Sequence, residues 1–201
     1  MDIYIPQLLK DLLPNELLGQ CQAHHFEKGE YLFHKGIKPE FMFFIVSGEA
    51  VLIRESSHGE PIVLQRCKSG FISEASLLTD AYHCDAIATQ SGQAITLPIK
   101  FLINALTDSQ FSLKWVQLLS KEIMRLRTQS ERLGLKDIRS KLIHLIETEG
   151  KQGILTLQAD YKSMASEIGV THEALYRTMA ILEDEGLLKK HSHSLELLQK
   201  K

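Results

Sequence analysis

The order of hydrophobic and polar positions divides the chain into a first part that predicts strands and a second part that predicts helices. Between Phe26 and about Leu97, short apolar runs rich in aromatic and β-branched residues alternate with turn residues. Five glycines recur roughly every ten residues and are expected in turns with positive φ: Gly29, Gly36, Gly48, Gly59 and Gly70. This pattern is typical of an antiparallel barrel or sandwich.

After Pro98 the apolar positions change to helical spacing, and residues 107–133 contain neither glycine nor proline. One series follows steps of three and four residues, which is the pattern of a coiled-coil seam: Val116, Leu119, Ile123, Leu126, Ser130 and Leu133. Phe111, Trp115 and Leu118 lie off this seam and offer a second apolar face to the strands. A helix with two apolar faces favours a homodimer interface, and the alternative is a buried helix of a monomer.

Beyond Gly134 the chain predicts a helix-turn-helix. Asp137 offers an N-cap for a helix of residues 138–149, and residues 161–185 form two further helical segments. A helix-turn-helix needs a small residue between its helices, a glycine in the turn and an apolar residue that locks the second helix; Ala165, Gly169 and Leu175 supply them. The final segment, LLKKHSHSLELL, predicts two short strands around a polar turn, which would make the unit winged.

The second helix of this unit presents polar side chains where a protein reads the major groove. With Thr171 as N-cap, one exposed side holds His172, Glu173, Tyr176 and Arg177. Glutamate can accept from the cytosine amino group, and arginine can bind guanine O6 and N7 together. Lys189 and Lys190 on the predicted wing are expected to reach phosphates, or they keep a strand edge charged against aggregation.

Composition limits the classes of function that remain. The 201 residues are 44% hydrophobic and 24% charged, which argues against disorder, and the net charge of −2 gives no general affinity for nucleic acid. We therefore expect a local interface, with the acidic residues 183–185 at the far end of the reading helix, away from the wing lysines. No apolar stretch is long enough to span a membrane and no signal peptide is evident, so the expected location is the cytoplasm.

The whole pattern resembles the cyclic-AMP receptor protein/FNR family of bacterial transcription regulators. The segments FEKGEYLFHKGIKPEFMFFIVSGEAVLI and ASEIGVTHEALYRTMAILEDEGLL carry the resemblance. It implies an α+β fold: an antiparallel, jelly-roll-like β-roll sensor over residues 1–106, a dimerisation helix and hinge over 107–136, and a winged helix-turn-helix over 137–201. The implied partners are a second copy of the chain, double-stranded DNA at a pseudo-palindromic site and RNA polymerase.

The resemblance also places a cyclic-nucleotide pocket, and the residues there depart from the family pattern. In the family, a Gly-Glu pair and an arginine hold the ribose and the cyclic phosphate. Here the Gly-Glu pair is Ser73 and Glu74, and the arginine position holds Cys84, followed by Asp85. A carboxylate without an arginine repels a phosphate, so we expect a degenerate pocket that does not bind cyclic AMP.

Other sensor chemistries stay open at this stage. His83 and Cys84 are candidate haem ligands, although neighbours cannot both be axial, and His24, His25 and Cys21 form an incomplete metal set. A thiol switch, an unknown small-molecule effector or no effector are the other options, and no cofactor or metal is predicted. The chain has no GxSxG, HExxH or P-loop motif, so an enzyme is not expected; the alternative function is a ligand-binding module without DNA binding.

Overall fold

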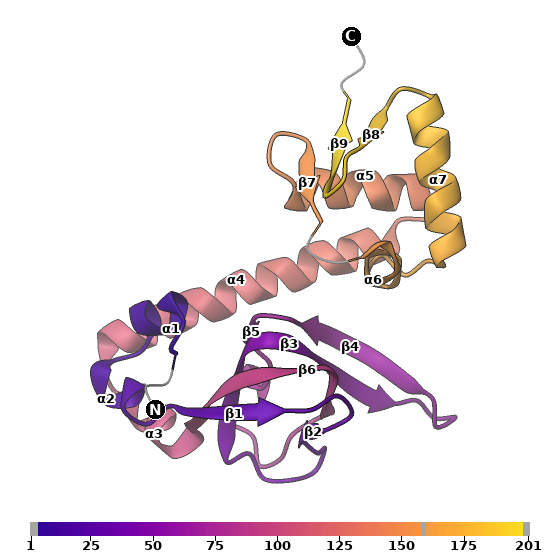
Figure 1. Cartoon of the computed structure of the whole chain (residues 1–201). Helices are drawn as coiled ribbons and strands as arrows, with labels where there is room; N and C mark the ends of the chain where they lie inside the picture. The colour runs from indigo at the N-terminus through magenta and orange to yellow at the C-terminus, as the bar shows by residue number, and fades with distance from the viewer. Residues whose placement is uncertain (1–3, 158–159, 199–201) are drawn as a thin grey trace. The chain divides into compact units, whose positions relative to one another are not determined.

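The computed structural model describes residues 4–157 and 160–198. Its contacts separate two compact units, Met1–Gln117 and Leu118–Lys201, and the division falls inside one long helix, α4 (Ser109–Gly134) (Figure 1). The combination of antiparallel sheets and helices confirms the predicted α+β class. No described helix is long and apolar enough to cross a membrane. The predicted domain limits at residues 106 and 136 stay predictions.

The first unit is an antiparallel sheet with short helices at its start and end. Its six strands have the order β1-β6-β3-β4, with β2 paired to β6 and β5 paired to β3. In chain order, the elements are α1 (Gln7–Leu12), α2 (Asn15–Leu18), β1 (Gln22–Phe26), β2 (Tyr31–Phe33), β3 (Phe41–Glu55), β4 (Pro61–Cys67), β5 (Gly70–Phe71), the 3-10 turn η1 (Glu74–Ser76), β6 (Asp85–Pro98), α3 (Ile99–Ala105) and the first part of α4.

The prediction that each of the five glycines lies in a turn between strands is wrong for Gly48. All five predicted glycines have positive φ, but Gly48 does not separate two strands; it lies inside β3, where the pairing with β6 shifts register. Gly48 faces the backbone of residues 91–92 so closely that a Cβ there would lie 2.6 Å from the Ser91 carbonyl oxygen. The glycine therefore allows two long strands to bend together, which is the role of a β-bulge.

Gly92 makes the reciprocal close approach, and its substitution gives a testable prediction. A Cβ at Gly92 would overlap the Ser47 carbonyl oxygen and lie 2.7 Å from the Gly48 Cα. We expect Gly92→Ala to lower the free energy of unfolding by about 1–3 kcal/mol, because backbone cannot yield as a side chain does. Gly134→Ala is the control: no atom lies within 4 Å of its Cβ, and it should be neutral or stabilising by up to about 1 kcal/mol. Equal thermal transitions of the two variants, followed by circular dichroism, would contradict the prediction.

The start of α4 packs on the strands, as its second apolar face predicts. Phe111 and Trp115 are buried, and the Trp115 ring lies edge-on to Phe71 with the ring centroids 5.3 Å apart. Asp108 caps this helix by accepting the Phe111 amide. The N-terminal helices α1 and α2, which the sequence pattern did not predict, bury Leu9 and Leu17 in the same unit.

The second unit contains the predicted helix-turn-helix with a three-stranded sheet. After the rest of α4, its elements are α5 (Ile138–Glu149), β7 (Ile154–Thr156), α6 (Tyr161–Glu167), α7 (His172–Asp184), β8 (Leu188–Lys190) and β9 (Ser194–Leu197), with the sheet order β7-β9-β8. Asp137 and Thr171 cap α5 and α7, as predicted. Because each cap satisfies an amide that has no partner within its own helix, the helix starts are encoded locally.

Candidate nucleic-acid interface

The turn between α6 and α7 is built from the residues that the sequence singled out. Ala165 is buried between the helices, and its carbonyl oxygen accepts the Val170 amide at 2.9 Å. Gly169 has a φ of 67°, which closes the turn without side-chain strain. Leu175 is fully buried in the core of the unit, with Met179 and Leu182 on the same side. The opposite side of α7 is therefore presented outward.

The N-terminal half of α7 exposes the predicted reading residues. Glu173, Tyr176 and Arg177 are exposed and His172 is partly buried. The Glu173 carboxyl accepts hydrogen bonds from its own backbone amide and from the Thr171 hydroxyl, which lower its pKa, and the nearby His172 adds to the effect. The group is therefore an acceptor at neutral pH. Among the described residues, no carboxylate forms an ion pair with Arg177. The guanidinium is available to an external acceptor.

The wing places its two lysines differently. Lys189 is exposed, whereas the Lys190 ammonium lies 2.6 Å from a Glu183 carboxylate oxygen and the Lys190 amide donates to the same carboxylate at 3.2 Å. The expectation that Glu183 lies away from the wing lysines is therefore wrong. Strand β8 turns back along α7 directly after that helix ends, which brings the last turn of α7 beside the strand. Lys189 is the freer cation of the two for a phosphate.

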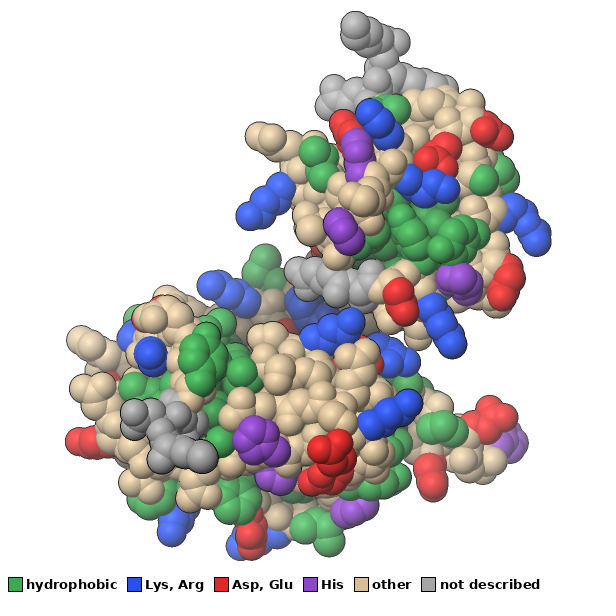
Figure 2. Space-filling view, viewed as in Figure 1, with side chains coloured by type: hydrophobic (Ala, Val, Ile, Leu, Met, Phe, Trp, Pro, Cys, Tyr) green, Lys and Arg blue, Asp and Glu red, His purple; other side chains and the backbone are tan. Residues whose placement is uncertain are grey.

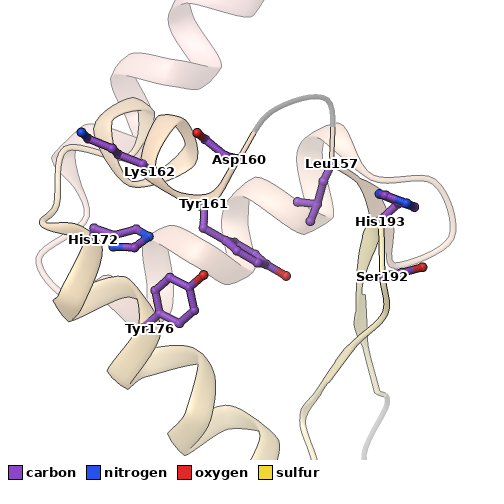
Figure 3. A pocket seen from close by; sticks show the side chains of 8 residues that line it. All are labelled: Leu157, Asp160, Tyr161, Lys162, His172, Tyr176, Ser192 and His193. Carbon is purple, nitrogen blue, oxygen red and sulfur yellow. The ribbon is translucent and has the colours of Figure 1, made fainter.

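A groove of about 580 Å³ lies between the two helices and the wing. Figure 3 shows its lining, which comes from the residue directly after β7, the starts of α6 and α7 and the β8–β9 turn: Leu157, Asp160, Tyr161, Lys162, His172, Tyr176, Ser192 and His193. On the face in Figure 2, hydrophobic side chains of this unit gather beside histidine and basic side chains. Tyr161 and Lys162 were not predicted here, because their proximity to residue 176 depends on the angle between two helices.

The predicted dimer seam lies along the outer side of α4. Its residues are exposed by 56% at Val116, 49% at Ile123, 43% at Leu126 and 46% at Leu133, while Leu119 is partly buried. Met124, beside the seam, is 67% exposed. Apolar side chains recurring on one helix at coiled-coil spacing are the pattern that a second helix covers.

In the β unit, two of the predicted pocket residues are part of the packed interior. Ser73 is buried; its hydroxyl accepts the Phe43 amide at 3.0 Å and lies 3.2 Å from the Met42 sulfur. Cys84 is 1% exposed and belongs to the hydrophobic cluster of the sheet. Both side chains are enclosed by the packing of the β unit.

The other two predicted pocket residues, Asp85 and Glu74, are also part of the packed β unit. Asp85 accepts the Lys35 amide at 2.9 Å and lies 3.4 Å from the His34 ring, so it anchors the segment after β2. Glu74 starts the turn η1 and is partly buried. Arg54, which sequence analysis did not single out, donates to the His83 carbonyl oxygen at 3.2 Å. An arginine thus reaches this loop from β3, although none stands at position 84.

The cysteines and histidines give little support to redox or metal sensing. All three thiols are buried; burial raises the pKa of Cys21 to about 11 and also raises the pKa of Cys84. A buried thiol with a raised pKa is a poor nucleophile, which argues against a thiol switch. Within residues 4–157 and 160–198, no group of three or more His, Cys, Asp or Glu residues is arranged to hold a metal ion. His83 lies 3.3 Å from the Ser76 hydroxyl, and its neighbour Cys84 is enclosed.

Known proteins match the first unit alone and also most of the chain. Residues 23–109 match the cyclic nucleotide-binding domain family. The chain is 26% identical over 185 residues to the Global nitrogen regulator of Synechococcus elongatus, covering 85% of this chain and 82% of that protein. It is 22% identical over 194 residues to the cAMP-activated global transcriptional regulator CRP of Salmonella typhimurium, covering 89% and 90%. The chain therefore contains a region that matches the cyclic nucleotide-binding domain family, and over most of its length it is similar to transcription regulators of the CRP type.

Solved structures of other proteins share the fold. FixK2 from Bradyrhizobium japonicum matches with a TM-score of 0.64 at 16% identity, covering 89% of this chain and 93% of that one. The resemblance described above predicts Glu and Arg at positions 173 and 177, which this chain has, and glycine and arginine at positions 73 and 84, where it has Ser73 and Cys84.

Proposed function

We propose that this chain is a homodimeric, sequence-specific DNA-binding transcription regulator whose β-roll does not use cyclic AMP. The observation that carries the proposal is the exposed first half of α7, where Glu173 and Arg177 lie four residues apart on a helix capped by Thr171. Residues four apart share a helix face, so both side chains can enter one major groove. The names of the relatives, a global nitrogen regulator and a global transcriptional regulator, support the same function.

Selection from randomised DNA duplexes at moderate salt, followed by sequencing, tests DNA reading directly. We expect an inverted repeat with a G·C pair in each half-site, because glutamate and arginine read cytosine and guanine. The half-sites should be separated by about one helical turn, roughly 34 Å, as two-fold related reading helices require. A failure to enrich any motif would favour a ligand-binding module without DNA binding.

The exposed seam of α4 supports the homodimer part of the proposal. We expect Ile123→Glu to shift the protein from dimer to monomer in sedimentation velocity, because a charge would have to be buried in an apolar seam. Gln117→Glu adds the same charge at an exposed position beside the seam and should leave the dimer intact. If both variants sediment like the parent chain, the seam is not the interface.

The side-chain contacts in the β unit support the absence of cyclic-AMP sensing. Ser73 and Cys84 are buried, Asp85 is used by the segment after β2, and a carboxylate at that point would repel a phosphate. We expect isothermal titration calorimetry with cyclic AMP to give no micromolar binding, with or without the selected DNA duplex. Saturable heat at micromolar cyclic AMP would contradict this part of the proposal and leave the DNA-binding part standing.

A further inference from the structure

Three aromatic rings lie in a row across the first turns of α6 and α7. The His172 and Tyr176 rings are 4.6 Å apart between centroids, at an interplanar angle of 75°. The Tyr176 and Tyr161 rings follow at 5.3 Å and 68°. Both pairs have the edge-to-face geometry that aromatic side chains prefer, so the middle ring, Tyr176, is held from two sides.

Tyr161 is itself held between the core of the unit and Tyr176 of the reading helix. It is partly buried, and burial raises the pKa of its phenol, with a smaller opposing effect from Lys190. That lysine is the one fixed to Glu183 at the end of α7. Tyr161 also packs against the hydrophobic core of this unit, whereas Tyr176 is exposed, so the more enclosed Tyr161 ring is the one that orients Tyr176.

Tyr176 keeps much of its surface open. Its side chain is 41% exposed and forms one wall of the groove, with Ser192 and His193 of the wing turn across from it in Figure 3. An aromatic ring held rigidly and left open to solvent offers a flat apolar surface at little further cost in conformational entropy on binding.

The reading helix thus has two different flanks. Glu173 and Arg177, four residues apart, form a hydrogen-bonding flank, whereas His172 and Tyr176, also four apart, form an aromatic flank. The base edges in the major groove carry hydrogen-bonding groups and one apolar group, the thymine methyl. An apolar flank next to a flank that reads G·C is complementary to a thymine methyl in the same half-site.

We propose that Tyr176 is a specificity-determining residue that contacts a thymine methyl group in each half-site, and that Tyr161 is the positioning residue that holds its ring there. This inference rests on the proposed DNA-binding function. It adds a base preference that Glu173 and Arg177 cannot supply.

Substitution of uracil for thymine removes only the methyl group and provides the test. In the duplex recovered by site selection, each thymine of the half-site is replaced in turn by uracil, symmetrically in both halves. At one position we expect binding of the parent chain to weaken about fourfold per half-site, the effect of losing one buried methyl-sized group. Tyr176→Ala should bind the thymine and uracil duplexes equally, and Tyr176→Phe should still distinguish them, because the ring makes the contact.

The Tyr161 variants test positioning. Tyr161→Ala should reduce the discrimination between thymine and uracil, while Tyr161→Phe should retain it because the ring contact survives. Tyr161→Leu preserves apolar volume without a ring and should behave like Tyr161→Ala, which separates positioning from a general loss of folding.

Two results would overturn the inference. One is a parent chain that binds every uracil duplex as it binds thymine; the other is a Tyr161→Ala variant that keeps the full thymine preference. In both cases, a loss of specific binding by Arg177→Ala on the same duplex would show that the proposed DNA-binding function stands without the aromatic contact. If site selection recovers no duplex at all, the proposed function itself is wrong.

Discussion

Replacing Arg132 with alanine is expected to lower the free energy of unfolding by about 3 kcal/mol, the lower end of what breaking a buried ion pair costs. The Arg132 side chain has no exposed surface. Its guanidinium pairs with Glu149 at the end of α5 and lies 3.6 Å from a carboxylate oxygen of Glu167 at the end of α6. Both carboxylates are 41% exposed, which keeps the cost at the lower end.

The reason for the loss is that one cation joins the ends of three helices. Burial, followed by the neighbouring Glu149, raises the pKa of the Glu167 carboxyl, and Arg132 acts against that shift. Without the guanidinium, the two carboxylates face one another across a cavity that the side chain filled. The second half of α4 would then lose its main polar connection to α5 and α6.

Urea unfolding followed by circular dichroism measures the effect. Arg127→Ala is the matched control, because Arg127 is exposed on the same helix and its truncation should change stability by less than about 0.5 kcal/mol. Arg132→Lys keeps the charge but cannot reach two carboxylates with a planar fork, so it should fall between the two. If Arg132→Ala and Arg127→Ala unfold at the same urea concentration, the ion cluster contributes no stability.

The elements that sequence analysis predicted well are those whose signals are local. The N-caps Asp137 and Thr171 lie three residues before the amides from which they accept hydrogen bonds. Gly169 adopts the positive φ that the turn between α6 and α7 needs. The apolar spacing of α7 correctly placed Leu175 inside, because helix periodicity alone assigns the buried side.

The features that sequence analysis missed depend on contacts between distant segments. Gly48 has the positive φ expected of a turn, yet pairing with β6 keeps β3 continuous through it. Arg132 is one of several basic residues on α4 that the sequence predicts to face solvent. It is buried because α5 and α6 pack against this part of the helix. The contact between Tyr161 and Tyr176 likewise depends on the angle between two helices.

The charge of the predicted DNA-binding region could likewise be counted from the sequence, but its pairing could not. The predicted DNA-binding region nearly balances acidic and basic residues, which indicates weak affinity for random DNA and reliance on base contacts. The pairing of Lys190 with Glu183 reduces the available positive charge further. Base-reading residues should therefore account for an unusually large share of the binding free energy.

Replacing Arg177 with alanine is expected to weaken binding to the selected duplex by about 1–3 kcal/mol per half-site, the value of a bidentate contact to guanine. Binding to random duplex should change much less, because no described carboxylate pairs with Arg177 and the role proposed for it is to read a base. Fluorescence anisotropy with both duplexes, at several salt concentrations, measures the two effects.

Lys189→Ala is the matched comparison, since it removes one exposed cation from the wing. A phosphate contact weakens binding to all sequences alike and reduces the slope of log K against log salt by about 1. Arg177→Lys keeps the charge but loses the planar fork, so it should resemble Arg177→Ala on the selected duplex. If Arg177→Ala instead loses equally on both duplexes and Arg177→Lys restores binding, Arg177 is a phosphate contact, and the half-site must be read by Glu173 and the aromatic flank.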